Sequence, residues 1–142
     1  MDIAYTNKMT VEQYNNLRKS VEWDAVQEDQ AKKGLENSAF LIVLTDNAVP
    51  VGMARVITDF GYSVLIADVI VHPDYQGSGL GKMIMTKVME YIYQDIAPGQ
   101  KKMISLLAAH GKEGFYKKFG FTERPNDKLG PGMSQWISGE VK

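Results

Sequence analysis

The stretch that most constrains this chain is residues 68–85, where an apolar run, a glycine-rich loop and an amphipathic segment follow one another. The β-branched run over 69–71 is typical of a buried strand, and Pro73 ends it because proline brings no N–H to a sheet. Apolar residues then recur at helical spacing, at Leu80, Ile84, Val88, Tyr91 and Ile92. The pattern predicts a strand, a loop and a helix that ends near Tyr93.

Three glycines alternate in this loop, at Gly77, Gly79 and Gly81. Glycine has no Cβ to hold a ligand away from the backbone N–H groups, and a helix N-terminus carries roughly half a positive charge. Backbone N–H groups at a helix N-terminus bind phosphate and other anions. We therefore expect the loop to bind a phosphorylated ligand.

Two common phosphate-binding motifs do not fit the loop. A P-loop needs a glycine, four residues and then Gly-Lys-Ser/Thr, but counting back from Gly81 reaches Gln76, and Met83 follows Lys82. A dinucleotide fingerprint G-x-G-x-x-G that starts at Gly77 needs glycine at position 82, which is Lys82. The loop therefore belongs to a different class of phosphate site.

The run Gln76-Gly77-Ser78-Gly79-Leu80-Gly81 resembles the Q/R-x-x-G-x-G/A signature of the GNAT superfamily of acyl-CoA-dependent N-acetyltransferases, and residues 71–75 resemble its V-x-P-x-Y lead-in. The resemblance implies that backbone groups of Val69, Ile70 and Val71 bind the pantetheine arm of acetyl-CoA. It also implies a pyrophosphate site made by Gln76, Gly77, Ser78, Gly79, Leu80, Gly81 and Lys82. The alternative is a glycine-rich turn that opens an ordinary helix.

A second segment, residues 114–121, resembles the F-Y-x-K-x-G-F block of the same family. The resemblance implies that the hydroxyl of Tyr116 contacts the coenzyme and protonates the departing thiolate, whereas Phe115 and Phe119 are expected in an aromatic cluster. Ala109 stands where many family members have an asparagine that contacts the pantetheine arm. The block also resembles that of glucosamine-6-phosphate N-acetyltransferases, which makes a phosphorylated amino sugar one candidate acceptor. Polyamines, aminoglycosides, arylalkylamines and a protein lysine or N-terminus are the others.

The reaction implied by the resemblance needs a group that takes a proton from the amine, since a free alkylamine has a pKa of about 10.4. Asp68, at the end of the strand, is the candidate base, and its alternative role is that of a structurally paired carboxylate. Histidine is a common general base at neutral pH, which makes His72 and His110 further candidates, but a lone histidine near a strand end is more often simply solvated. The candidate acceptor-binding residues are Glu22, Trp23 and Arg124.

The remaining elements follow from local patterns. Thr10 and Gln13 form a capping box for a helix to about Lys19, and a second helix is expected over 25–35. Strands are expected over 3–6, 40–45, 51–58, 62–71, 103–108 and 133–138, with a short helix over 112–118. The strand over 40–45 lacks alternation and is expected to be buried on both faces. The crossover helix predicts that the strand over 103–108 is parallel to that over 62–71.

The predicted fold class is therefore α/β of the α+β type. It is a single GNAT-like domain over residues 1–142, with a mixed six- to seven-stranded sheet, about four helices and parallel strands that splay after the glycine loop.

Composition limits the function classes. Of 142 residues, 44% are hydrophobic and 23% charged, with a formal net charge of −1, which argues for a soluble globular domain and against nucleic acid or an anionic membrane as the main partner. The chain has no cysteine, which excludes disulfides, thiolate metal sites and a cysteine nucleophile. No metal is expected. The composition, with an N-terminus that lacks a signal-peptide pattern, predicts a cytoplasmic protein.

The sequence therefore predicts an enzyme that moves an acetyl group from acetyl-CoA to a primary amine of a small molecule, by direct attack in a ternary complex. Two alternatives are a protein N-acetyltransferase and a non-catalytic acyl-CoA sensor on the same fold. Trp136 on the terminal strand either pairs with a second subunit, which would make a homodimer, or packs inside.

Overall fold

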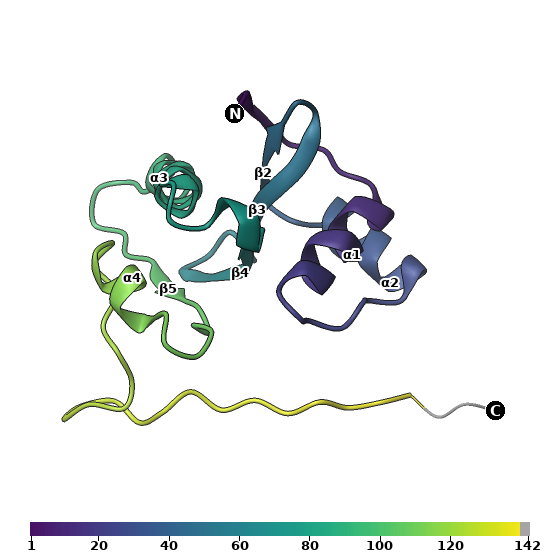
Figure 1. Ribbon diagram of the computed structural model, residues 1–142. Coiled ribbons are helices and arrows are strands. Elements are labelled where there is room, and N and C mark those ends of the chain that lie inside the picture. The colour runs from purple at the N-terminus through teal and green to yellow at the C-terminus, as the bar shows by residue number, and fades with distance from the viewer. Residues whose placement is uncertain (140–142) are drawn as a thin grey trace. The chain divides into compact units, whose positions relative to one another are not determined.

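The structure, a computed structural model, describes residues 1–139. Its contacts divide the chain into two units, Met1–Leu106 and the residues from Leu107 onward, each of which is described by itself (Figure 1). Within the described residues, the second unit contains one helix, α4 (Glu113–Lys117). The first contains β1 (Ile3–Thr6), α1 (Val11–Ser20), α2 (Glu28–Glu36), β2 (Phe40–Asp46), β3 (Val49–Thr58), β4 (Ser63–Val71), η1 (Pro73–Tyr75), α3 (Leu80–Tyr93) and β5 (Met103–Ser105). A single domain over 1–142 stays a prediction.

The first unit is built on one mixed sheet of five strands in the order β1-β2-β3-β4-β5. The first four are antiparallel neighbours, and β5 is parallel to β4, as predicted from the crossover helix. The parallel ladder stops at Leu65 and Ser105, whereas β4 runs on to Val71. The last six residues of β4 therefore have no partner in β5, which agrees with the predicted splay.

The predicted strand count of six to seven is too high. The strand expected over 103–108 ends at Ser105, and the strand expected over 133–138 is absent, since these residues pair with no strand in the described part of the chain. The terminal segment has strand-like composition, but Trp136 is 96% exposed there. Composition without a hydrogen-bonding partner does not make a strand, because the ladder and the buried face supply its stability.

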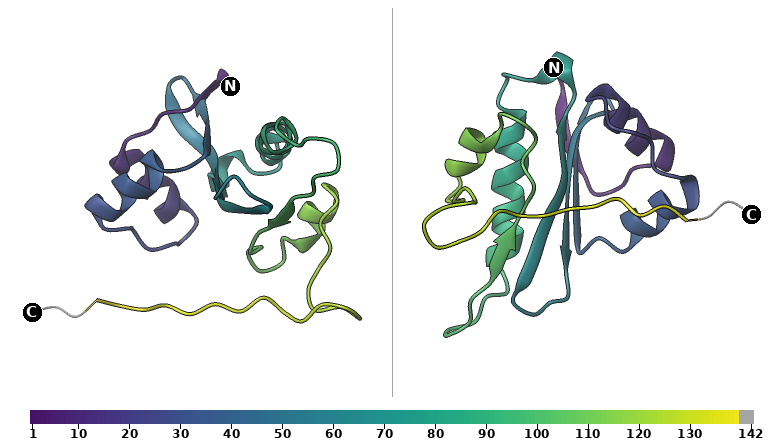
Figure 2. Two further views of the ribbon diagram at one scale, coloured as in Figure 1. Left: turned by 180° about the vertical axis from the view of Figure 1, so that it is seen from behind. Right: turned by 90° about the horizontal axis from the view of Figure 1, so that it is seen from below.

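Helices cover both faces of the sheet in the first unit. In the right-hand view of Figure 2, α3 lies on one side and α1 and α2 lie on the other. Tyr14 and Leu17 of α1 are buried in one cluster with Met53 and Ile70 from the sheet. On the other side, α3 buries Leu80, Ile84, Met85, Val88 and Ile92, four of which are on the predicted stripe. The run over 42–45 of β2 is buried throughout, which agrees with burial on both faces.

The close packing of α3 against β3 depends on Gly52. A Cβ at this position would lie 3.0 Å from Cδ1 of Ile84 and 3.2 Å from the backbone oxygen of Ile70. The backbone oxygen cannot move aside as a flexible side chain can, so only glycine fits without displacement. The contact fixes α3, and with it the glycine loop that precedes α3, against the sheet.

The observed start of α1 agrees with the start predicted from the sequence, whereas the observed start of α2 does not. The capping box is confirmed: Thr10 Oγ1 accepts from the N–H of Gln13, and the Gln13 side chain accepts from the N–H of Thr10. Helix α2 begins at Glu28 rather than near residue 25. The reason is that the Asn15 side chain bonds both the N–H and the carbonyl of Val26, which keeps this residue out of a helix.

Candidate active site

The glycine loop joins the end of β4 to the start of α3. Gly77 and Gly79 have φ of +81° and +87°, in the left-handed region that favours glycine. A Cβ built on either residue meets nothing within 4 Å, so the backbone conformation, not crowding, requires glycine here. The loop is therefore open above its backbone.

The first turn of α3 has backbone donors that the helix itself does not use. The first intrahelical bond runs from the N–H of Met83 to the carbonyl of Gly79, 3.1 Å away, and within the described residues no side chain caps this N-terminus. The N–H groups of Leu80, Gly81 and Lys82 precede that bond, and Lys82 is exposed. Donors beside an open glycine loop fit the pyrophosphate of acetyl-CoA.

Two polar side chains of the predicted site stabilise the loop. Gln76 Nε2 donates to the carbonyl of Val71 at 2.9 Å, and Ser78 Oγ donates to the carbonyl of Tyr75. Four of the seven predicted pyrophosphate-binding residues thus lie in the loop, Gln76–Gly79, and the other three form the start of α3. The two side-chain bonds hold the loop in its conformation.

A β-bulge interrupts β4 just before the loop. Met53 pairs with Ile70 and Arg55 with Ala67, so Asp68 and Val69 both stand opposite a single residue of β3, Ala54. Asp68 has φ of +52°, which is uncommon for a residue other than glycine. Val69, Ile70 and Val71 lie at or beyond the bulge, in the part of β4 that β5 does not pair.

The Asp68 carboxylate accepts hydrogen bonds from three side chains. Oδ2 accepts from the Tyr14 hydroxyl at 2.6 Å and from Arg55 Nε at 2.7 Å, and Oδ1 accepts from Arg18 Nη1 at 3.2 Å. The side chains of both arginines and of Asp68 are only 12–14% exposed. These contacts favour the structurally paired role for Asp68, whereas a role as the catalytic base stays a prediction.

Tyr14 is the titratable group that this cluster changes most clearly. Burial, and then the hydrogen bond to Asp68, raises the pKa of Tyr14 to about 12, because both disfavour the phenolate. The hydroxyl therefore remains a donor to Asp68 at neutral pH.

Tyr14, Arg18 and Arg55 were not among the predicted site residues. Arg55 did carry a signal, because an arginine within an apolar strand must find a partner when it is buried. Tyr14 and Arg18 are four residues apart and so share a face of α1. Their shared partner, Asp68, lies 54 positions after Tyr14 and 50 positions after Arg18 in the chain, so local sequence does not identify it.

The interhelical loop, residues 21–27, contains two of the predicted acceptor-binding residues. Glu22 is exposed and has φ of +65°, and Trp23 is half-buried. The N–H of Trp23 donates to the carbonyl of Arg18 at 2.9 Å, and the Arg18 guanidinium lies 5.4 Å from the centre of the Trp23 ring. Arg18 Nε also donates to the carbonyl of Asp24 at 2.8 Å. The structure thus connects Trp23 to Asp68 through Arg18.

The other predicted residues, Tyr116 and Arg124, belong to the second unit. Tyr116 is 9% exposed on α4, and its ring packs edge-on against Phe115 and Phe121 at centroid distances of 5.0 and 6.4 Å. Burial raises the pKa of Tyr116, which keeps its hydroxyl in the protonated form that an acid requires. Arg124 Nε donates to the carbonyl of Gly130 at 2.7 Å.

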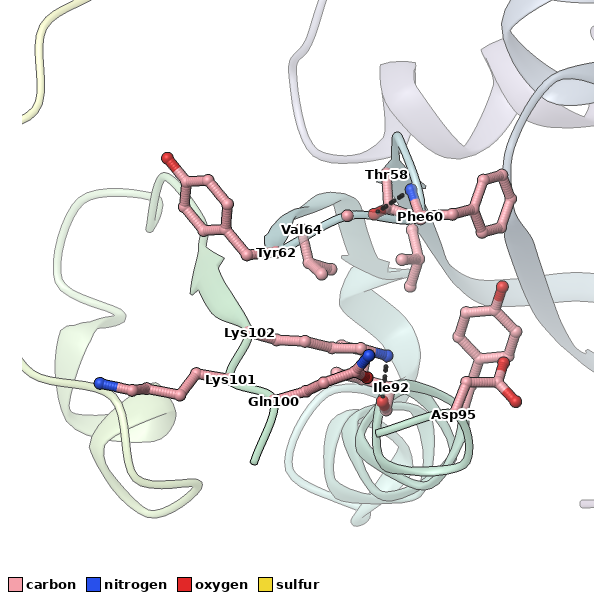
Figure 3. A pocket seen from close by; sticks show the side chains of 12 residues that line it. Thr58, Phe60, Tyr62, Val64, Ile92, Asp95, Gln100, Lys101 and Lys102 are labelled. Atoms are coloured by element: carbon pink, nitrogen blue, oxygen red, sulfur yellow. Dashed lines mark hydrogen bonds between the residues drawn. The ribbon is translucent and has the colours of Figure 1, made fainter. Parts of the chain in front are cut away.

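A separate pocket of about 510 Å³ lies at the other end of β4 and α3 from the glycine loop (Figure 3). Val64 and Ile92 contribute to its apolar lining, and Lys102 Nζ donates to the carbonyl of Ile92 at 2.7 Å. None of the predicted site residues lines it. The pocket is therefore distinct from the loop that fits a pyrophosphate.

Comparison with known proteins identifies the family. The model of the acetyltransferase (GNAT) domain matches residues 36–123, which include the glycine loop, the bulge and Tyr116. An uncharacterized N-acetyltransferase, ycf52, of Pyropia yezoensis is 33% identical over 135 residues, which are 91% of this chain and 75% of that protein. Serotonin N-acetyltransferase 2, chloroplastic, of Oryza sativa subsp. japonica is 33% identical over 105 residues, 70% of this chain and 50% of that protein.

A solved structure extends the likeness to the fold. A protein of unknown function from meticillin-resistant Staphylococcus aureus, described as a probable acetyltransferase, superposes with a TM-score of 0.84 at 31% identity, covering 94% of this chain and 99% of that one. The chain is thus a member of the GNAT family and is an acetyltransferase.

Proposed function

We propose that this enzyme transfers an acetyl group from acetyl-CoA directly to the primary amine of a small molecule while both substrates are bound. The observation that carries the proposal is the open glycine loop, with its uncapped α3 N-terminus, at the end of a bulged strand. Membership of an acetyltransferase family supports the use of acetyl-CoA.

The loop residues Gln76–Lys82 would hold the pyrophosphate through backbone N–H groups, and the dipole of the fourteen-residue α3 would favour its charge. Backbone groups of Val69–Val71 would pair with the pantetheine arm as with an added strand, since β5 does not occupy this part of β4. Holding thioester and amine side by side contributes about 7–11 kcal/mol to lowering the barrier.

The amine must be neutral before its nitrogen attacks the thioester carbonyl carbon. A new C–N bond forms and the C–S bond breaks, and Tyr116 donates its hydroxyl proton to the leaving thiolate. The attacking nitrogen, positively charged after it bonds to carbon, releases one proton to solvent to give the neutral amide. The Tyr116 phenolate takes a proton back from solvent. Burial supports this role because it keeps Tyr116 protonated at neutral pH. Glu22, His72, His110 and Asp68 are the candidates for accepting the amine proton.

For the acceptor we propose an arylalkylamine. Trp23 offers a half-buried aromatic ring in the interhelical loop, and aromatic rings prefer stacked or edge-to-face partners. The rice relative named serotonin N-acetyltransferase 2 aligns over 70% of this chain, which supports testing this class first. Glu22 and Arg124 remain proposed acceptor-binding residues, and phosphorylated amino sugars and protein amines are the competing acceptors.

The test combines acetyl-CoA thermal-shift titration with a thiol-release assay against a panel of amines. We expect stabilisation by acetyl-CoA and release with arylalkylamines. Tyr116→Phe should lower turnover by about 10²- to 10⁴-fold and leave the Kd of acetyl-CoA unchanged. The matched control is Tyr93→Phe, which removes a hydroxyl from an exposed residue of α3.

Three results would contradict the proposal in different ways. Stabilisation without release from any amine would support an acyl-CoA sensor, and release only with a protein substrate would support a protein N-acetyltransferase. No stabilisation would refute the pyrophosphate site in the glycine loop.

The location and the oligomeric state of the enzyme are separate proposals. None of the helices within residues 1–139 is long and apolar enough to cross a membrane. A cytoplasmic location without nucleic acid or membrane partners stays a proposal, and so does a homodimer. Trp136 and Ile137, 96% and 82% exposed, are the residues that a second subunit would cover, and sedimentation would show whether one does.

A further inference from the structure

We propose that Asp68 is a positioning residue, which holds the interhelical loop and the β4 bulge in one fixed arrangement and thereby sets the affinity for the amine. The inference rests on the proposed function, in which the amine enters at the interhelical loop. It assigns Asp68 a role through its neighbours rather than through proton transfer.

The first step concerns the bulge. Asp68 has φ of +52°, and a residue other than glycine stays in this region only when its surroundings over-determine it. Three hydrogen bonds to its carboxylate supply that constraint, from Tyr14 and Arg18 of α1 and from Arg55 of β3. The next residues, Val69–Val71, are those proposed to bind the pantetheine arm.

The second step concerns the interhelical loop. The Arg18 guanidinium donates two hydrogen bonds in different directions. Nη1 donates to Asp68 at 3.2 Å, and Nε donates to the carbonyl of Asp24 at 2.8 Å. Its guanidinium also lies over the rings of Tyr14 and Trp23, at 5.7 and 5.4 Å. Because the guanidinium is planar and rigid, the bond from Nη1 to Asp68 also fixes the direction in which Nε points. The charge of Asp68 therefore fixes the loop backbone beside Trp23.

The third step concerns α2. Arg55 Nε donates to Asp68, and Arg55 Nη1 donates to the carbonyl of Gly34 and to Ser38 Oγ, each at 3.1 Å. The carboxylate thus connects α1, the end of α2, β3 and β4 at one point. Movement of either helix relative to the bulge would break at least one of these bonds.

The same contacts explain why Asp68 acts by position. Oδ2 accepts from Tyr14 and from Arg55, and Oδ1 accepts from Arg18, so three donors from two other elements converge on this one carboxylate. Each of these bonds would change in length or direction if Asp68 moved toward a bound amine. The contacts therefore favour a role for Asp68 in holding its neighbours in place.

The test uses two substitutions of graded severity. Asp68→Asn keeps the size and shape of the side chain and removes its charge. Arg18→Lys keeps a positive charge beside Asp68 but lacks the Nε donor that bonds the carbonyl of Asp24. We expect both variants to raise the KM for the amine by about 10- to 100-fold, the range that corresponds to the loss of one hydrogen bond to a charged group. In Arg18→Lys, which leaves the bonds of Tyr14 and Arg55 to Asp68 in place, the Kd of acetyl-CoA should stay within about twofold. In both variants the pH profile of kcat should keep its shape. Asp29→Asn, which removes an exposed surface pair with Lys33, is the control and should leave the kinetics unchanged.

Each outcome decides the matter. Loss of one limb of the pH profile in Asp68→Asn, with an unchanged KM for the amine, would show that Asp68 is the base and overturn the inference. An unchanged KM in Arg18→Lys would overturn it as well, and this variant decides alone if Asp68→Asn does not fold. Wild-type protein that releases no thiol from any amine would overturn the proposed function instead, because that result does not depend on either substitution.

Discussion

The hydroxyl of Tyr14 provides the sharpest test of the Asp68 cluster, and Tyr14→Phe is the perturbation that isolates it. The side chain is 4% exposed, and its ring packs in the cluster with Leu17, Met53 and Ile70, so phenylalanine keeps the apolar contacts. Only the 2.6 Å bond to Asp68 is lost. A hydrogen bond to a charged group contributes about 1.5–3 kcal/mol, and we expect the variant to be about 2 kcal/mol less stable at neutral pH.

The difference between wild type and variant should shrink in alkali. The pKa of Tyr14 is about 12 in the folded protein and 10.0 in the unfolded chain. A pKa raised by folding contributes stability that is complete below pH 10 and is lost between about pH 10 and 12, because the unfolded state loses its proton first. For these two values the loss at pH 11 is about 1.4 kcal/mol as an upper figure. Phenylalanine does not titrate, so the gap should fall below about 1 kcal/mol.

Urea unfolding at about pH 8 and pH 11, followed by tryptophan fluorescence, measures the gap directly. Comparing two variants at each pH cancels the titration of the other six tyrosines and of the lysines. Tyr93→Phe, at an exposed position, should overlay the wild-type curve. A gap between wild type and Tyr14→Phe that is equal at both pH values, or wider in alkali, would refute a Tyr14 hydroxyl held neutral by burial and by Asp68.

Two further substitutions test the cluster and the loop. Arg55→Met removes one partner of a largely buried ion pair and should destabilise the protein by about 3–5 kcal/mol in urea unfolding; a loss under about 1 kcal/mol would show that the pair is solvated. Gly79→Ala forces a side chain into a φ of +87° and should weaken acetyl-CoA binding in calorimetry. Gly99→Ala, at φ of +84° and also with nothing within 4 Å, carries the same backbone penalty and should leave binding unchanged, so an equal effect from both would refute the pyrophosphate site.

Features set by neighbours in sequence could be predicted. The capping box of α1 needs only Thr10 and Gln13, and the strand, glycine loop and α3 are encoded within residues 68–93. The parallel pairing of β4 with β5 follows from the helix that connects them, because parallel neighbours need a long crossover connection, which is usually an α-helix.

Features set by distant contacts could not. The start of α2 depends on Asn15, eleven residues before the Val26 backbone that it holds. The bulge at Asp68 depends on which residue of β3 pairs with it, and its carboxylate meets a tyrosine 54 residues away. The terminal segment around Trp136 shows the opposite failure, since a strand-like sequence was predicted to pair where the described structure offers no partner.

The bulge in β4 also shows how a paired strand can contain one additional residue without losing its register. Pairing is antiparallel and in step on both sides of it, with Ala67 opposite Arg55 and Ile70 opposite Met53, so Val69 is in effect an insertion that shifts no other pair. Without it, Asp68 alone would stand opposite Ala54 and its carboxylate would turn to the α3 face, because facing residues share a side of a sheet. The extra residue thus directs the Asp68 carboxylate to the face of the sheet that α1 covers, where Arg18 and Arg55 lie. The apolar face of the sheet that packs against α3 is unchanged. A lineage could acquire or remodel this polar cluster by a single insertion, with the rest of the sheet already in place.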